Sequence, residues 1–497
     1  MSDWESPDPA ELIALNSDAD WEALLDRYPA LNPRPLQRCL EVAQAGGAAT
    51  AVIETRYLDE DYRSEYSAFF SKTFAEISDT AHRVHFFRRA LRAHELWRLP
   101  DDHGYLGFMV IRPSWLGRVG RTMLAPPPEL APAVRTSVES TVSFFGQRLL
   151  IAAVPFAQQD TQFGRCAHAA AWICHYTAAL RHDTHRRVMA DFTLLADANV
   201  VEGRPVPSQG LTGLQLTNLL RDFGLPPLFY RMGELPTPNP NQNPPPHAPG
   251  QNPGEWDTRI VSIACRYLNS GFPVLIGTYD HAFVLIGYDR EPRRGDTDWI
   301  RFIRHDDQRG PYLVVPDVLA DVDPATGDAY GWWTMLVAPV PERLWLAPEP
   351  AERSGQNYLR AVSQEAVARG LVAERLALHT LHDRGHVTFR TYAITSTAFK
   401  AAAVDRGLDQ VSAREYRLAR LPRLVWVVEA VDRRKRRSGQ PSVIGEAVFD
   451  STSTDYDPRE LIVRVPGALL VVQTDGTMRF PLATMRRACR SAAASQP

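Results

Sequence analysis

The segment that decides the fold is Pro155–Trp172, which reads PFAQQDTQFGRCAHAAAW. Its first half has the polar and glycine residues of a loop, whereas the run from Cys166 to about Val200 is rich in alanine and leucine, contains no proline or glycine, and predicts a helix. Cys166 is therefore expected at a helix N-terminus, where the helix dipole favours the nucleophilic thiolate. A single cysteine beside alanines is by itself more typical of a buried structural thiol.

Two further reactive groups follow Cys166 in chain order. His281 opens the apolar run AFVLIGY at 282–288, which predicts a strand with an imidazole at its beginning. The next predicted strand, WIRFIR at 299–304, is followed closely by Asp306 and Asp307. A carboxylate at that point can fix the imidazole tautomer and stabilise the imidazolium. Asp306 is expected in this role because it is nearer to the strand, and Asp307 is the alternative.

A glutamine upstream of the cysteine completes the pattern. Gln159 lies seven residues before Cys166, Gln158 lies eight before it, and Gln162 lies four before it. A side-chain amide and the backbone N–H of Cys166 can together form an oxyanion hole for a tetrahedral intermediate. Gln159 is the expected donor, with Gln158 as its alternative.

With these residues in this order, the segment from about 150 to 315 resembles the papain-like cysteine peptidase superfamily, and most closely its bacteriocin-processing, double-glycine peptidase-like branch. The matching text is SQGLTGLQL at 208–216, LNSGFPVLI at 268–276 and HAFVLIGY at 281–288. The resemblance implies that Cys166 is the nucleophile, His281 the base, Asp306 the orienting group and Gln159 the oxyanion donor.

The expected fold class is α+β, with a papain-like core in which a helix carrying the cysteine packs on an antiparallel sheet carrying the histidine and the aspartate. The core is expected at 141–350, with a proline- and asparagine-rich insertion at 236–253. A mixed α/β region at 1–140 is expected to pack on this core, and a separate α+β domain at 351–497. Within the first region, Tyr62–Leu99 lacks proline and glycine and predicts a long helix.

Composition excludes several classes of partner. The net charge is −3, and the basic run Arg433–Arg437 is interpreted as a solvated hairpin loop, so no nucleic-acid partner is expected. No stretch of about 18 apolar residues exists to span a membrane. The five cysteines are scattered and odd in number, and the N-terminus has neither the basic start nor the apolar segment of a signal peptide, so a reducing cytoplasm is the expected location.

No metal or other cofactor is expected. His168, His175 and His182 recur every seven residues, which separates them by about 10 Å along a helix, too far to share one ion. The expected function is therefore hydrolysis of a peptide or amide bond in a peptide or protein substrate, through a Cys-His-Asp triad and an acyl-enzyme, with the C-terminal domain as a candidate surface for a protein partner. The alternatives are a catalytically inert binding or scaffold module, and an acyl transferase or deamidase that uses the same triad.

Overall fold

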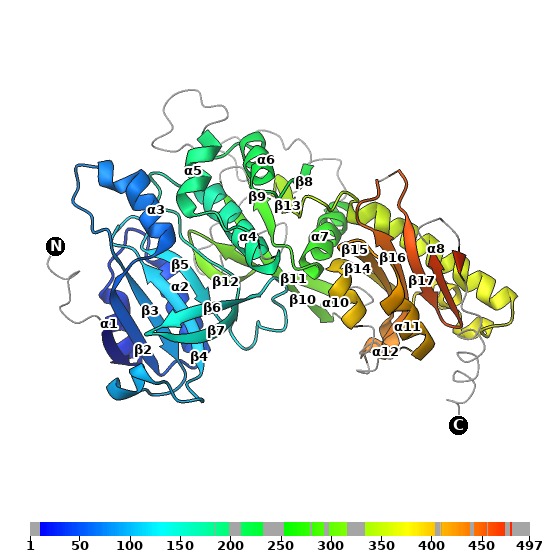
Figure 1. Cartoon of the computed structure of the whole chain (residues 1–497), viewed down its shortest axis with the longest axis horizontal. Helices are drawn as coiled ribbons and strands as arrows, with labels where there is room; N and C mark the ends of the chain where they lie inside the picture. Colours follow the sequence, from blue (N-terminus) through cyan, green and yellow to red (C-terminus); the bar gives the residue numbers. More distant parts are fainter. Residues whose placement is uncertain are drawn as a thin grey trace. The chain divides into compact units, whose positions relative to one another are not determined.

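The chain folds into two compact units, Met1–Pro341 and Glu342–Pro497, each considered by itself below (Figure 1). Both the region expected at 1–140 and most of the core expected at 141–350 fall within the first unit. The computed structural model describes residues 10–182, 184–197, 210–231, 253–278, 281–292, 298–315, 333–402, 408, 410–437, 442–454, 456–472 and 478–479. The insertion expected at 236–253 lies outside the described residues except for Pro253, where a helix begins.

The N-terminal part of the first unit is built on an antiparallel sheet whose strands follow chain order. They are β1 Ala10–Ala14, β2 Thr50–Tyr57, β3 Ala81–Phe87, β4 Tyr105–Ile111 and β5 Val119–Leu124. Helix α1 (Asp18–Asp26) precedes helix α2 (Arg34–Ala45), and α2 packs against β5. Strands β6 (Val138–Phe144) and β7 (Gln147–Ala153) pair separately as a hairpin.

The prediction of a long helix over Tyr62–Leu99 is wrong. Helix α3 spans only Glu60–Ala68, a 3-10 turn follows at Phe70–Lys72, and the centre of the segment is strand β3, AHRVHFF. Every residue of β3 is buried, and the strand pairs with β2 on one side and β4 on the other. A strand that is buried on both faces has no period-two alternation, so hydrophobic periodicity does not identify it.

The second sheet of this unit carries the predicted histidine and aspartates. Its strand order is β12-β11-β10-β9-β13-β8, with antiparallel pairing. The strands are β8 Pro227–Arg231, β9 Val274–Gly277, β10 Ala282–Pro292, β11 Asp298–Asp306, β12 Gly310–Val315 and β13 Met335–Pro339. Helix α2 also packs against β12, so it lies between the two sheets.

Helix α4 (Cys166–His182) packs on this second sheet against β9 and β10. Ala282, Val284 and Ile286 alternate along β10 and join the same buried cluster as Trp172 and Ile173 of the helix. The helix begins at Cys166 as the sequence predicts, but it ends at His182, and a separate helix spans Met189–Asp197. The remaining helices of this part are α5 Met189–Asp197, α6 Gly213–Asp222 and α7 Pro253–Asn269.

The second unit contains an antiparallel sheet in the order β14-β15-β16-β17-β18-β19. Its strands are β14 Val387–Thr395, β15 Leu424–Asp432, β16 Val443–Asp450, β17 Glu460–Val465, β18 Ala468–Val472 and β19 Met478–Arg479. Helix α8 (Pro348–Ala368) packs across β14 to β18. The basic run Arg433–Arg437, expected in a hairpin loop, lies in the connection between the paired strands β15 and β16 and forms a short helix, α12.

The shorter helices of the second unit lie around this sheet. They are η3 Glu374–Leu376, α9 Leu378–Asp383, α10 Ser396–Ala401 and α11 Gln410–Leu418. Both units thus mix helices with antiparallel sheets, which is the expected α+β class. Among the helices that the structure describes, none has the length and apolar content needed to cross a membrane.

Candidate functional site

The loop before Cys166 is held in shape by the buried carboxylate of Asp160. The backbone N–H groups of Gln162 and Phe163 donate to Asp160 Oδ1 at 2.7 and 2.6 Å, and the N–H of Gly164 donates to the same carboxylate. Thr161, inside this loop, has a φ of 70°, a left-handed conformation that costs a β-branched residue about 1–3 kcal/mol. The bonds to Asp160 hold this strained loop, which sets the direction in which the chain enters the helix.

Cys166 is the first residue of α4 and is partly exposed. The backbone N–H of Arg165 donates to Nδ1 of His168 at 3.1 Å, and the carbonyl of Arg165 accepts from the N–H groups of His168 and Ala169. Burial lowers the pKa of His168 to about 4, so its imidazole is neutral and can accept this bond. His168 therefore caps the helix, and the backbone N–H of Cys166 lies in the first turn, where N–H groups lack intrahelical acceptors.

His281 lies immediately before β10, with its side chain about 10% exposed. Its backbone N–H donates to Oγ1 of Thr278 at 3.1 Å, and its carbonyl accepts from the backbone N–H of Thr278 at 2.8 Å. These bonds fix the backbone of His281 at the end of the sheet. The side chain of Cys166 is near enough to this imidazole to be one of the groups that raise its pKa. The structure thus brings near each other two residues that lie 115 positions apart in the sequence.

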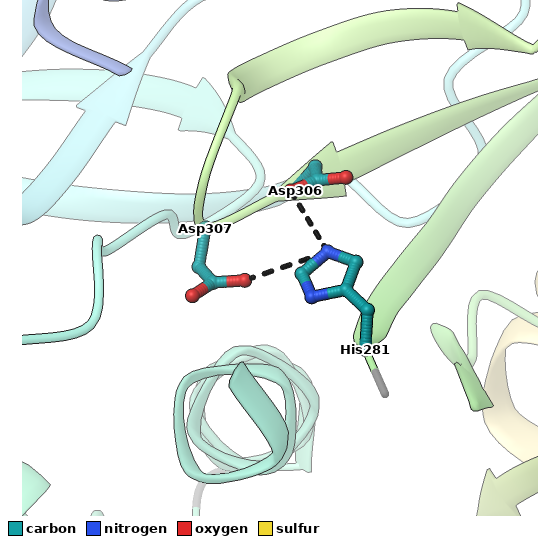
Figure 2. Close-up of side chains that lie close together, drawn as sticks. All are labelled: His281, Asp306 and Asp307. Atoms are coloured by element: carbon teal, nitrogen blue, oxygen red, sulfur yellow. Dashed lines mark hydrogen bonds and ion pairs between the residues drawn. The ribbon is translucent and has the colours of Figure 1, made fainter. Parts of the chain in front are cut away.

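Both predicted aspartates lie on one side of this imidazole and face the same ring nitrogen (Figure 2). His281 Nε2 donates to Oδ1 of Asp306 at 3.1 Å, whereas Oδ1 of Asp307 is 3.9 Å away. Asp306 Oδ1 also accepts the backbone N–H of Gln308 at 3.0 Å. Because Nε2 is bonded to Asp306, Nδ1 is the ring nitrogen open to other partners, and the side-chain amide of Gln308 lies 3.4 Å from it.

The charges around His281 determine its protonation. Burial lowers the pKa of His281, but the Asp306 carboxylate, together with Cys166 and Asp307, outweighs burial and raises that pKa well above its usual value. Burial opposes ionisation of Asp306 as well, yet His281 and Arg304 lower its pKa overall. For Asp307, burial and the neighbouring Asp306 charge prevail over His281 and raise the pKa to about 7. The favoured pair is therefore an imidazolium and an ionised Asp306.

The two candidate glutamines have different surroundings. Gln158 is buried, its Oε1 accepts the backbone N–H of Val119 at 3.1 Å, and its Nε2 donates to the carbonyl of Asn32 at 3.3 Å. Gln159 is partly exposed, but its Oε1 is buried and has no hydrogen-bond partner among the described residues. Both ends of the Gln158 amide are thus committed to the fold, whereas the Gln159 amide has an unbonded oxygen.

The same three side chains of Figure 2 form a potential metal site. Among the described residues, His281, Asp306 and Asp307 offer one donor atom each, and these atoms all lie within 4.8 Å of one another. One nitrogen and two carboxylate oxygens suit a divalent cation such as zinc. A metal there would use the same Nε2 that His281 directs at Asp306, so metal binding and the His281–Asp306 hydrogen bond exclude each other.

Residues of the N-terminal part support the site, and the sequence analysis missed them. The ring of Phe163, in the loop before the cysteine, stacks on Phe69 with ring centroids 4.7 Å apart. Trp172 of α4 donates from Nε1 to Oδ1 of Asp61 at 3.1 Å, and Arg186, which follows α4, donates from NH1 to Oδ2 of Asp61 at 2.6 Å. Asp61 is 111 residues from Trp172 in the chain, and no local pattern links them.

Of the predicted residues, His281 and Asp306 are hydrogen-bonded, Cys166 is near enough to His281 to affect its pKa, and Gln159 lies at the start of the loop that leads to Cys166. Asp307 adjoins the group at ion-pair distance, 3.9 Å from the imidazole, without a hydrogen bond to it. A comparison with protein families found no matching family model, and a search of curated proteins found no matching protein. The chemistry of the site is therefore argued from its geometry.

Proposed function

We propose that this chain is a papain-like cysteine hydrolase that cleaves a peptide or amide bond through Cys166, His281 and Asp306. The observation that carries the proposal is that His281 bonds Asp306 through Nε2 at 3.1 Å and that Cys166, the first residue of α4, is near enough to the same imidazole to raise its pKa. A nucleophile, a base and an orienting carboxylate connected in this way are the parts that covalent acyl transfer requires. The location of Cys166 at a helix N-terminus adds support.

In the proposed reaction, His281 and Cys166 form an imidazolium–thiolate pair. The sulfur attacks the substrate carbonyl carbon, and the imidazolium gives its proton to the leaving nitrogen as the carbon–nitrogen bond breaks. Water then loses a proton to His281 and attacks the thioester, and breakage of the carbon–sulfur bond releases the acid and restores the imidazolium–thiolate pair. The backbone N–H of Cys166 and the amide of Gln159 stabilise the oxyanion in both steps.

Thiol labelling tests the nucleophile without knowledge of the substrate. Cys39, Cys174 and Cys265 are buried, and burial raises the pKa of Cys39 and of Cys174. We expect iodoacetamide at pH 6 to modify Cys166 at least about tenfold faster than free cysteine, because the imidazolium stabilises the thiolate. We expect His281→Ala to remove this difference. Mass spectrometry of the labelled peptides identifies the site, and an ordinary rate at Cys166 in the native protein would contradict the proposal.

Substrate profiling tests the reaction itself. A peptide library is incubated with the wild-type chain and with Cys166→Ala, and new termini are identified by mass spectrometry. Cleavage that appears only with the wild type supports the hydrolase. Rapid, Cys166-dependent labelling without cleavage, deamidation or acyl transfer would instead favour an inert module that has kept a reactive thiol.

The two glutamines give a matched pair of variants. We expect Gln159→Ala to lower kcat by about 10²- to 10³-fold, because an oxyanion donor is lost, while the melting temperature stays unchanged. Gln158→Ala instead leaves the Val119 N–H and the Asn32 carbonyl without their partner, which costs about 1–3 kcal/mol of folding free energy. Steady-state kinetics and thermal denaturation separate these outcomes, and an unchanged kcat in Gln159→Ala would remove Gln159 from the mechanism.

A further inference from the structure

Asp307 carries a buried carboxylate that the proposed triad does not use. Its side chain is 2% exposed, and neither of its oxygens has a hydrogen-bond partner among the described residues. Figure 2 shows this carboxylate directed at the imidazole of His281, with Oδ1 at 3.9 Å from Nε2. An ionised carboxylate is costly to bury unless it is paired or holds a metal. The position of Asp307 is therefore that of a ligand for a cation.

His281, Asp306 and Asp307 present three donor atoms to one point. Oδ1 of Asp306 lies 3.1 Å from Nε2 of His281, and one donor atom from each residue lies within 4.8 Å of the other two. Ligands that bind a tetrahedral zinc ion at about 2.1 Å lie about 3.4 Å from one another. Small rotations of the two carboxylates therefore bring all three donors onto one ion.

The groups around the three donors also suit a cation. Arg304 Nε lies 3.8 Å from Oδ2 of Asp306 and offsets one of the two carboxylate charges, which leaves the other to the metal. The side-chain amide of Gln308 lies 3.4 Å from Nδ1 of His281. Turned over, this amide presents its oxygen to the N–H that Nδ1 carries when Nε2 holds a metal. Such a bond orients the ring of a metal-binding histidine.

We propose that His281 Nε2, Asp306 and Asp307 bind a zinc ion, and that the bound ion switches off the reactive thiol of Cys166. One imidazole and two carboxylates favour zinc over magnesium and calcium, which prefer oxygen ligands alone. Three protein ligands leave the fourth position of the ion to water. The switch rests on the hydrolase proposed above, whereas the metal site rests on the three donors alone.

The switch follows from the nitrogen that the metal takes. Zinc replaces the proton on Nε2, this proton passes to solvent, and the hydrogen bond from Nε2 to Asp306 is lost. The ring of His281 then keeps one proton, on Nδ1, and has no nitrogen left to accept another. It cannot become the imidazolium that stabilises the Cys166 thiolate, so the thiol returns to ordinary reactivity.

Isothermal titration calorimetry with ZnCl2 tests the site on full-length Cys166→Ala, in which the thiol cannot serve as a ligand. We expect one tight site per chain, for which MgCl2 and CaCl2 do not compete. Asp307→Asn in the same background is expected to weaken zinc binding by at least about 10- to 100-fold, since losing a mere hydrogen-bond partner of a ligand costs that much. Zinc binding that disappears in Cys166→Ala, or that Asp307→Asn leaves intact, overturns the site.

Glu374→Gln in the Cys166→Ala background is the matched control. Glu374 is exposed, and its Oε1 lies 3.2 Å from Nε2 of His379, so this pair offers one imidazole and one carboxylate. The zinc affinity is expected to stay within about twofold in this variant, because two ligands do not complete a zinc site. A loss as large as that in Asp307→Asn would overturn the assignment.

Cobalt absorption tests the site without a variant, in case Asp307→Asn weakens the fold. The wild-type chain loaded with Co²⁺ is expected to show the bands of nitrogen and oxygen ligands alone. A sulfur-to-cobalt charge-transfer band would place the ion on Cys166 and overturn the site.

Thiol labelling tests the switch. We expect Zn²⁺ to slow the reaction of iodoacetamide with Cys166 by about tenfold or more, to the rate of free cysteine, and Asp307→Asn to require more zinc for the same effect. Zinc that binds Cys166→Ala but leaves the labelling of the wild type unchanged overturns the switch. If Cys166 reacts as slowly as free cysteine without zinc, the hydrolase and the switch both fail, whereas the titration still decides the metal site.

Discussion

Cys166→Ala and His281→Ala are each expected to lower the rate of the proposed amide hydrolysis by about 10⁴-fold or more, which is the usual consequence of removing a nucleophile or its base. The double variant is expected to lose no more activity than the less active of the two single variants, because both residues act in the same step. The measurement is kcat/KM on a peptide found by profiling. Activity that persists in either single variant would contradict the proposed mechanism.

The fold is expected to survive both substitutions. Cys166 is only partly exposed at the start of α4, and Ala167 with Ala169 already provides small side chains in that turn. The matched control is Cys174→Ala on the same helix, whose thiol is 1% exposed. That variant is expected to lower the melting temperature while it leaves turnover intact. The contrast separates loss of chemistry at Cys166 from loss of packing in α4.

The sequence predicted the parts of the site that depend on local signals. Cys166 follows a glycine-containing loop and begins an alanine-rich run, and His281 begins an apolar run, so the start of each element is marked in the chain itself. The structure agrees at both positions. The prediction of a helix over Tyr62–Leu99 failed because β3 pairs with β2 on one edge and with β4 on the other. Such pairing depends on residues distant in the chain, which local helix propensity does not reflect.

The choice between neighbouring candidates could not be made from the sequence. Gln158 and Gln159 are adjacent and chemically identical, and only the bonds to Val119 and Asn32 show that the first is part of the fold. The contacts that residues from distant segments make with α4 were missed for the same reason. Asp61 joins α4 through Trp172 across 111 residues, and a single sequence carries no signal for such pairs.

The two aspartates have different roles in the proposed mechanism, which predicts unequal effects on the rate. Asp306→Asn removes the anionic partner of Nε2 and is expected to lower kcat/KM by about 10²- to 10⁴-fold. Asp307→Asn removes a carboxyl group whose Oδ1 is 3.9 Å from the imidazole, and is expected to cost less than about tenfold. Both changes preserve side-chain size, so each variant serves as the control for the other. Equal losses would mean that the two carboxyl groups act as one unit.

The pH profile of the Asp306→Asn variant tests whether Asp306 raises the pKa of His281. Asp306 outweighs burial and raises the pKa of His281, so the imidazolium and its contribution to stability are present below the unfolded pKa of about 6.5 and are lost as the pH rises through the folded value. Asp306→Asn is therefore expected to shift the alkaline loss of kcat/KM to lower pH. If the alkaline loss of kcat/KM stays at the same pH in Asp306→Asn, Asp306 does not stabilise the imidazolium form of His281.

Asp307 differs from Asp306 in that its pKa is raised. Burial and the neighbouring Asp306 charge raise the pKa of Asp307 to about 7. The folded chain then holds a proton that the unfolded chain releases above about pH 4, so this residue makes stability fall as the pH rises from about 4 to about 7. Asp307→Asn cannot ionise and is expected to flatten that fall, which denaturant unfolding at several pH values measures. An Asp307→Asn variant whose stability falls as steeply as that of the wild type over this range would mean that Asp307 is already ionised beside Asp306.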